Sequence, residues 1–242
     1  KYLSLFHWLQ CNCACVYCFQ AKERELEGGF TDEIKKSQYY DAYPVLKEMQ
    51  DKNLLQKGKL YVEFGGGEPA ILKELPDLIK IVNETGFEFS LIMSSGILYS
   101  KDIQALLENP NTSFTVTIAA GSREVYKKIK QRDKFEQVKE NLRKYIANAP
   151  YPENIRIRYL IYEGINDNEK DIKDWLDMCV EIGTKSVEIT FEFCQSFNEK
   201  SGQPYNPHLK DLINYYLAEG AKTNMQCLVD MTTQGIMARG HY

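Results

Sequence analysis

Short apolar segments alternate with amphipathic segments along the chain. Six apolar segments are rich in β-branched and aromatic residues and are predicted to be strands: 2–8, 59–64, 88–93, 113–118, 155–161 and 186–193. The segments between and after them repeat apolar residues with a helical period, as Leu75, Leu78, Ile79 and Val82 do before Gly86. A strand followed by a helix, many times over, predicts βα units with right-handed crossovers and a parallel sheet.

The number of βα units limits the architecture. Six units are fewer than the eight that close a TIM barrel. We therefore predict an α/β fold, a partial (β/α)6 TIM-like barrel built on a parallel sheet. No linker rich in Gly, Ser or Pro divides the chain. We expect a barrel core over residues 1–197 and a short C-terminal helix and strand extension, residues 198–242, that packs on the barrel.

Polar and apolar residues alternate within several of the predicted strands. Ile155 and Ile157 share one face of their strand, and Arg156 and Arg158 share the other. The apolar face must meet the covering helices, so the polar face is expected to look into the barrel. A polar lumen favours a polar ligand, with internal ion pairs such as Arg158 with Glu192 as the alternative. The candidate substrate contacts are Glu63, Arg156, Glu188 and Glu192.

Composition and charge argue against several classes of protein. The 242 residues are 43% hydrophobic and 26% charged, which is ordinary for a globular protein, and the formal net charge is −4. No basic field therefore marks a nucleic-acid-binding protein. The sequence has no run of about 18 apolar residues, and its first residues show no signal-peptide pattern. We expect a cytoplasmic protein with neither nucleic acid nor a membrane as its partner.

Four of the seven cysteines lie close together directly after the first predicted strand. They are too near one another to form a useful disulfide framework, so metal binding or redox chemistry is favoured. Cys11, Cys15 and Cys18 have the spacing C-x3-C-x2-C. In βα barrels, ligands bind on the loops that follow the strands. Cubane iron–sulfur clusters are held by cysteine thiolates, and three of them leave one iron open to another ligand.

This spacing resembles the signature of the radical S-adenosylmethionine (radical SAM) enzymes. Further segments resemble the same superfamily: VEFGGGEPAIL (62–72), LIMSSG (91–96), the segment 113–138 and the segment 157–175. The resemblance covers roughly residues 2–193. It implies a [4Fe-4S] cluster held by Cys11, Cys15 and Cys18, with S-adenosylmethionine (SAM) chelating the fourth iron.

The resemblance also implies which residues bind SAM. Gly66, Gly67 and Glu68 would meet its amino group, and Lys130 or Arg132 would pair with its carboxylate. The sequence departs from the family pattern at Ser95, where Asn is common, and at Ala119, where Asp is common. The implied cofactor-binding residues are Tyr17, Gly65, Gly66, Gly67, Glu68, Ser94, Ser95, Thr117, Lys130, Arg132 and Arg158.

The implied activity is a radical SAM reaction. A one-electron donor such as flavodoxin or ferredoxin would reduce the cluster, and SAM would be cleaved to a 5′-deoxyadenosyl radical that abstracts hydrogen from a C–H bond. The substrate would be polar: a peptide, a protein or a sugar-type molecule. Cys194, directly after the sixth predicted strand, is a candidate catalytic residue, or with Cys227 a candidate ligand of a second cluster. A partly buried free cysteine is the plainer interpretation.

Two other functions compete with this one. Cys11, Cys13, Cys15 and Cys18 could instead form a structural zinc site, although four ligands within eight residues are crowded for zinc modules. The chain could also bind SAM or a cluster without catalysis, as a regulator. In the radical SAM interpretation, Cys13 is a bystander thiol and Cys179, on an apolar helical face, belongs to the core.

Overall fold

The computed structural model describes residues 2–5, 10–18, 41–55, 58–191 and 207–230. The strands are β1 (Tyr2–Leu5), β2 (Tyr61–Phe64), β3 (Phe89–Ser94), β4 (Thr112–Thr117), β5 (Ile155–Ile161), β6 (Ser186–Phe191) and β7 (Gln226–Val229). The α-helices are α3 (Tyr43–Asp51), α4 (Leu75–Thr85), α5 (Lys101–Leu106), α6 (Arg123–Lys130), α7 (Phe135–Asn148), α8 (Glu169–Glu181) and α10 (Pro207–Gly220). Two short 3₁₀ helices are η1 (Pro69–Ile71) and η2 (Pro152–Asn154).

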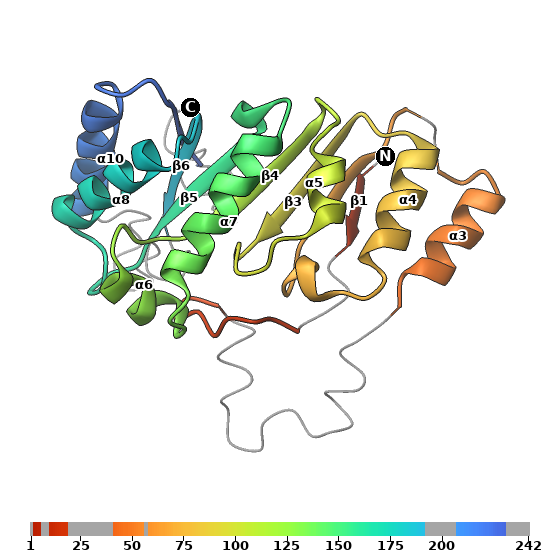
Figure 1. Ribbon diagram of the computed structural model, residues 1–242, viewed down its shortest axis with the longest axis horizontal. Helices are drawn as coiled ribbons and strands as arrows, with labels where there is room; N and C mark the ends of the chain where they lie inside the picture. The colour runs from red at the N-terminus through yellow and green to blue at the C-terminus, as the bar shows by residue number, and fades with distance from the viewer. Residues whose placement is uncertain (1, 6–9, 19–40, 56–57, 192–206, 231–242) are drawn as a thin grey trace, which may run out of the picture.

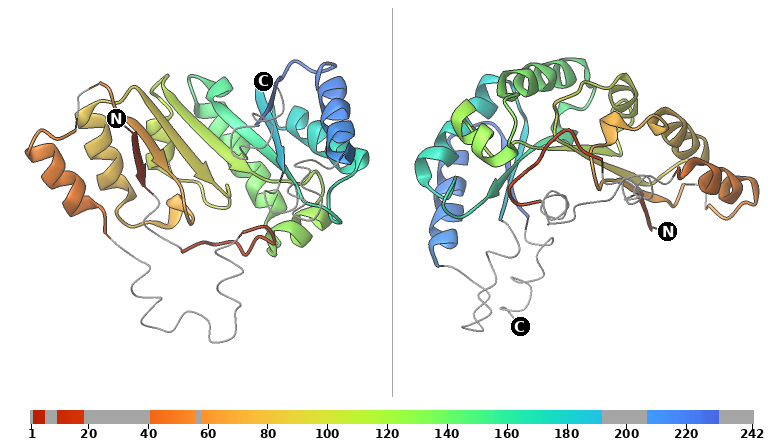
Figure 2. Two further views of the ribbon diagram at one scale, coloured as in Figure 1. Left: turned by 180° about the vertical axis from the view of Figure 1, so that it is seen from behind. Right: turned by 90° about the horizontal axis from the view of Figure 1, so that it is seen from below.

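The strands form one parallel sheet in the order β1-β2-β3-β4-β5-β6-β7. Each strand therefore lies beside the next one in the chain, as in a barrel wall, and β1 and β7 are the two edges of an open sheet. The helices cover one side of the sheet (Figure 1). Seen from below, the sheet curves into an arch with the helices on its outer side (Figure 2). The predicted α/β partial barrel is confirmed.

All six predicted strands are present, and the bounds of β5 match those predicted. The final residues of the first and sixth predicted strands, 6–8 and 192–193, lie outside the described residues. A strand without assigned bounds was expected in the C-terminal extension, and the structure has one there as a seventh strand. This strand, β7, pairs in parallel with β6 from Ser186↔Gln226 to Ile189↔Val229, so the C-terminal segment extends the sheet.

Side-chain caps explain where several helices begin. Ser100 Oγ accepts the N–H of Ile103 at the start of α5 (3.3 Å), and Asn168 Oδ1 accepts the N–H of Asp171 at the start of α8 (3.0 Å). The predicted end of α4 is also found, because Gly86 follows it with a φ of +75°. No described helix is long and apolar enough to cross a membrane.

The apolar core lies between the outer face of the sheet and the helices. Ile155, Ile157 and Tyr159 alternate along β5 on this face and are fully buried. The Tyr159 ring lies 5.0 Å from Trp175 of α8, and Trp175 lies 6.0 Å from Tyr216 of α10 (centroid distances). These aromatic contacts pack α8 and α10 against β5. The burial of every second residue of β5 confirms the two-residue alternation predicted from the sequence.

Asn166 joins the carboxyl ends of β4 and β5. Its Nδ2 donates to the carbonyls of Ala119 (2.8 Å) and Leu160 (2.9 Å), and its Oδ1 accepts the N–H of Tyr162 (2.6 Å). Ala119 has a φ of +59°, which is costly for a residue with a Cβ. The three hydrogen bonds hold this unusual backbone in place and fix the edge of the sheet on which the loops stand.

Gly220, the last residue of α10, allows β7 to approach the helix. A Cβ atom at Gly220 would lie 2.4 Å from Sγ of Cys227. We expect Gly220→Ala to lower the free energy of unfolding by about 1–3 kcal/mol, as overpacking does. In a Cys227→Ala background the clash disappears, and the same substitution should be neutral. Urea unfolding of the four proteins measures this coupling; an equal loss in both backgrounds would contradict it.

Candidate active site

The cysteine loop, residues 10–18, runs along the carboxyl edge of the sheet toward α6 (Figure 1). Cys11, Cys15 and Cys18 are half-buried, whereas Cys13 is only 2% exposed. The N–H of Cys13 donates to Sγ of Cys11 (3.4 Å), and the N–H of Cys18 donates to the carbonyl of Cys15 (3.0 Å). The three predicted cluster ligands thus lie on the loop where ligands bind in βα barrels.

The thiols of this loop have shifted pKa values. A hydrogen bond from the Cys13 thiol, supported by the nearby Lys130 ammonium and Tyr17 hydroxyl, lowers the pKa of Cys15 to about 5. A hydrogen bond from the Cys13 thiol also lowers the pKa of Cys11, and the pKa of Cys13 itself is raised. Cys13 therefore contacts both neighbours, so its interpretation as a bystander is incomplete. The thiolate is the form that binds metals.

The donor set fits an iron–sulfur cluster. Among the described residues, no three His, Cys, Asp or Glu side chains gather closely enough to share one metal ion. A tetrahedral zinc site needs four ligands around one ion, so the described geometry does not favour the zinc alternative. A cubane cluster places each thiolate on a different iron. Lowered thiol pKa values in a half-buried loop suit such ligands, and Cys11, Cys15 and Cys18 would hold the cluster.

Glu68 joins the ends of β2 and β3. Its side chain is 1% exposed, and Oε1 accepts the Ser94 hydroxyl (2.7 Å) and the N–H of Ala70 (3.1 Å). Oε2 accepts the N–H of Ser95 (2.6 Å). Gly66, beside it, has a φ of +97°. Contact of this glycine-rich segment with SAM stays a prediction, and the carboxylate additionally holds two strand ends together.

Asn12 is a residue of the loop that sequence reasoning missed. Its Oδ1 accepts the Ser95 hydroxyl (3.0 Å), and its carbonyl accepts Nε of Arg132 (3.2 Å). Gln10 lies two residues before Asn12 in the loop, and its carbonyl accepts the N–H of Glu68 (2.8 Å). The loop is therefore tied to the end of β3, to the glycine-rich segment after β2 and to the residues after α6. No spacing rule would have singled out Asn12, because its partners are far away in sequence.

The end of α6 supports the cysteine loop from the other side. The segment 127–134 has the composition of a solvated helix face, and Lys127 and Lys128 are indeed exposed. Lys130, however, is 2% exposed, and its Nζ donates to the Tyr17 hydroxyl (2.7 Å). Arg132 is exposed, and its guanidinium donates to main-chain carbonyls of Asn12 and Gln131.

A charged network lies on the inner face of β5, β6 and β7. Glu188 accepts Nη1 of Arg156 (2.8 Å) and Nε of Arg158. Nη2 of Arg158 lies 3.4 Å from Oδ2 of Asp230, which follows β7. The sequence analysis suggested Glu192 as the partner of Arg158; Glu192 lies outside the described residues, and Glu188 is the partner found. Asp230 was missed because it reaches Arg158 only through the pairing of β7 with β6, which no spacing in the sequence indicates.

Three buried polar atoms beside this network have no hydrogen-bond partner among the described residues: Nε of Arg156, Oγ1 of Thr115 and Oγ of Ser186. The sheet register aligns these residues, with Thr115 opposite Arg156 and Arg156 opposite Ser186. Thr115 is 1% exposed and Ser186 is fully buried. Buried polar groups are nearly always satisfied. This unsatisfied row is therefore a place where a hydrogen-bonding guest would be stabilised.

The remaining predicted residues are spread along the sheet. Thr117 ends β4, half-buried and opposite Arg158. Glu63 of β2 accepts the hydroxyl of Tyr2, and that bond raises the pKa of Tyr2 to about 12. Glu63 stands on β2 and Arg156 on β5, with β3 and β4 between them in the sheet. Cys194 lies outside the described residues.

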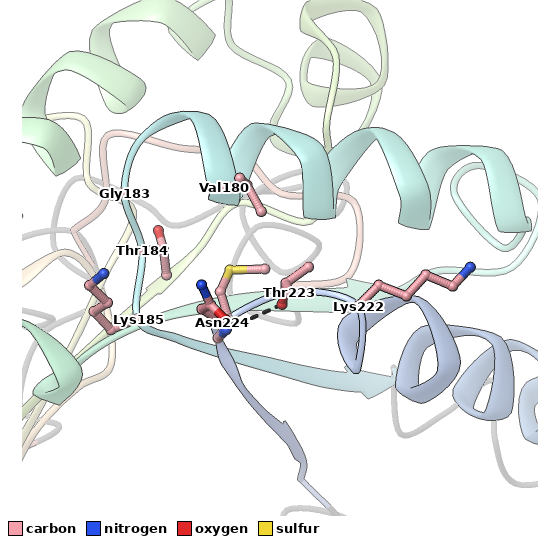
Figure 3. Close-up of a pocket in the computed structure, with 8 residues that line it drawn as sticks. Val180, Gly183, Thr184, Lys185, Lys222, Thr223 and Asn224 are labelled. Atoms are coloured by element: carbon pink, nitrogen blue, oxygen red, sulfur yellow. Dashed lines mark hydrogen bonds between the residues drawn. The ribbon is translucent and has the colours of Figure 1, made fainter.

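Cys227 lies away from the site. It alternates with Gln226 and Leu228 along β7 and borders Gly220 of α10. This position does not favour a second cluster at the carboxyl edge. A cavity of about 330 Å³ lies at the opposite edge of the sheet, between the turns 180–185 and 222–225 (Figure 3). Its charged groups, Lys185 and Lys222, are both exposed, and it takes no part in the candidate site.

Comparison with known proteins identifies related sequences. The chain is 26% identical over 199 residues to the GTP 3′,8-cyclase of Chlorobaculum tepidum, an alignment that covers 82% of this chain and 52% of the relative. It is 29% identical over 131 residues to the Fe-coproporphyrin III synthase of Methanosarcina barkeri, covering 54% of this chain and 28% of the relative. The chain therefore spans about half the length, or less, of these curated relatives.

Solved structures share the fold. Streptococcus suis SuiB bound to S-adenosylmethionine superposes with a TM-score of 0.61 at 14% identity, over 95% of this chain and 50% of SuiB. The protein anSMEcpe with bound AdoMet superposes with a TM-score of 0.63 at 14% identity, over 94% of this chain and 63% of that protein. At this identity the likeness is one of fold.

A family model described as the radical SAM superfamily matches residues 5–177. The match includes the cysteine loop, the glycine-rich segment after β2 and the Asn166 turn after β5, so it spans the elements that the geometry brings to one edge of the sheet. This chain belongs to the radical SAM superfamily, a family of enzymes that use a [4Fe-4S] cluster and S-adenosylmethionine.

Proposed function

We propose that this chain is the catalytic core of a radical SAM enzyme in which Cys11, Cys15 and Cys18 hold the [4Fe-4S] cluster. When bound, cluster and SAM supply the one-electron chemistry that lets an unactivated C–H bond lose a hydrogen atom. The residues of this chain bind the cofactors, orient the substrate and shield the reaction from side reactions. The cysteine loop and the glycine-rich segment stand at the carboxyl edge of the sheet, where barrel enzymes bind their ligands. An external flavodoxin or ferredoxin is the electron donor in this proposal.

The inner face of the sheet is the proposed substrate surface. The observation that carries this proposal is the unsatisfied row of Thr115, Arg156 and Ser186 beside the Arg–Glu–Arg–Asp network. If no ligand bound to the inner face, apolar side chains could fill it at little cost in stability. Closed barrels fill their interior in this way. Hydrogen-bonding groups of a substrate would satisfy the row.

The charge balance of this face favours an uncharged polar substrate over a strongly anionic one. Arg156 and Arg158 are matched by Glu188 and Asp230, so a guest meets a network without excess positive charge. Peptide amides, protein segments and sugar hydroxyls suit such a surface better than a triphosphate does. The relatives named GTP 3′,8-cyclase support a second candidate substrate, the nucleotide GTP.

Anaerobic reconstitution tests the activity. The protein is expected to bind about four irons per chain and to form 5′-deoxyadenosine from SAM and dithionite. Adding GTP, a peptide mixture or a sugar mixture then shows which class raises the rate of 5′-deoxyadenosine formation. A protein that binds only zinc, or that holds a cluster and never cleaves SAM, would overturn the proposal.

The inner face is tested with Thr115→Val, which removes one unsatisfied hydroxyl at nearly constant volume. We expect stimulation by the active substrate class to fall about tenfold, the effect of one lost hydrogen bond, with normal iron content. Thr85→Val is the matched control, because Thr85 Oγ1 is also buried without a hydrogen-bond partner among the described residues but belongs to α4, in the helix layer outside the sheet. Equal stimulation in both variants would remove the inner face from the proposal.

A further inference from the structure

Lys130, at the end of α6, is a buried basic residue next to the cysteine loop. It is 2% exposed, and its ammonium donates to the Tyr17 hydroxyl (2.7 Å) and lies 5.2 Å from the centre of the Tyr17 ring. A buried cation is stable only when other groups compensate its lost hydration, so the neighbours of Lys130 must supply that compensation.

The main chain around Lys130 is fastened to the cysteine loop. The N–H of Ala14 donates to the carbonyl of Lys130 (3.3 Å), and the N–H of Val16 donates to the carbonyl of Ile129 (3.0 Å). These two donors flank Cys15 in sequence. The last turn of α6 therefore fixes the backbone of the middle cysteine, and it brings the Lys130 side chain to the same place.

The groups that compensate Lys130 belong to the loop. The Lys130 ammonium donates to the Tyr17 hydroxyl and faces the Tyr17 ring, so a hydrogen bond and a cation–π contact replace part of its lost hydration. Tyr17 lies between Cys15 and Cys18, so the positive charge is held beside two of the proposed cluster ligands.

We propose that Lys130 is a positioning residue that provides a permanent positive charge beneath the cysteine loop and raises the reduction potential of the cluster that the loop holds. The proposal rests on the assignment of Cys11, Cys15 and Cys18 as cluster ligands. A fixed cation favours the more negative, reduced state of a nearby cluster. This role differs from the expected contact of Lys130 with the SAM carboxylate, because the ammonium group points to Tyr17.

The test is a redox titration of the reconstituted protein without SAM, followed by electron paramagnetic resonance. In Lys130→Met, which keeps length and removes charge, the ratio of reduced to oxidised cluster at a fixed potential should fall at least about tenfold, equivalent to about 59 mV. Lys130→Arg should restore most of the ratio. Lys128→Met is the matched control, because Lys128 lies on the same helix and is exposed; it should titrate like the parent.

Each other outcome has a defined meaning. An unchanged potential in Lys130→Met, with SAM affinity lowered in equilibrium dialysis, would overturn the inference and return Lys130 to the SAM carboxylate. A folded Lys130→Met protein that takes up no iron, while Lys130→Arg takes up a normal amount, would overturn the inference, because Lys130 would then serve cluster uptake and not the potential of the bound cluster. If the parent protein takes up no iron, the proposed function itself fails, and this inference fails with it.

Discussion

Replacement of Cys15 by alanine is expected to abolish the cluster and to reduce 5′-deoxyadenosine formation to background. Only three thiolates hold the cluster in this assignment, so the loss of one leaves a second iron without a protein ligand. Cys15 is also the thiol with a pKa lowered to about 5, and its backbone is fastened on both sides to α6. Iron content after anaerobic reconstitution and product analysis with SAM and dithionite measure the effect.

Two other cysteines serve as controls for this result. Cys227→Ala removes a thiol that borders α10 on the far side of the core, and it should keep normal iron content and activity. Cys13→Ala separates the two metal hypotheses, because it would destroy a four-thiolate zinc site and leave the C-x3-C-x2-C ligands intact. Loss of iron in Cys13→Ala but not in Cys15→Ala would overturn the ligand assignment.

Replacement of Gly121 by alanine is expected to cause the largest loss of stability. A Cβ atom at Gly121 would lie 2.1 Å from the backbone nitrogen of Trp175 and 2.2 Å from the carbonyl carbon of Asp174. These are main-chain atoms of α8, and Trp175 is fully buried in the aromatic stack with Tyr159. Neither the segment of Gly121 nor the backbone of α8 can move without disrupting the packing of the core. We therefore expect the free energy of unfolding to fall by about 3 kcal/mol or more.

The measurement is the midpoint of urea unfolding, with Gly183→Ala as the control. Gly183 has a φ of +83° and open space around its missing side chain. Alanine there meets only the conformational cost of a positive φ, about 1 kcal/mol. A similar loss in both variants would show that the close approach of α8 is not the cause. Gly121 also lies in the segment that joins β4 to α6, so its substitution should loosen the support of the cysteine loop.

Local geometry made the sheet predictable. The alternation of Ile155, Arg156, Ile157 and Arg158 assigns an outer and an inner face, because side chains in a strand alternate whatever the strand packs against. The structure confirms this assignment, with the isoleucines buried and the arginines on the face of Glu188. The strand expected in the C-terminal extension had no predicted bounds, because the four residues of β7, QCLV, are too short for a pattern to emerge.

The sequence by itself determined the superfamily, through the spacing of Cys11, Cys15 and Cys18 and the glycine-rich segment, and it determined the order of strands and helices. These features depend on residues close together in the chain. Only the tertiary structure decided which charges meet. Lys130 and Tyr17 are 113 residues apart, and Asp230 reaches Arg158 only because β7 joins the sheet. Burial and ion pairing depend on how elements that are distant in sequence pack together. The hydrophobic periodicity of one segment does not indicate which distant segment it contacts.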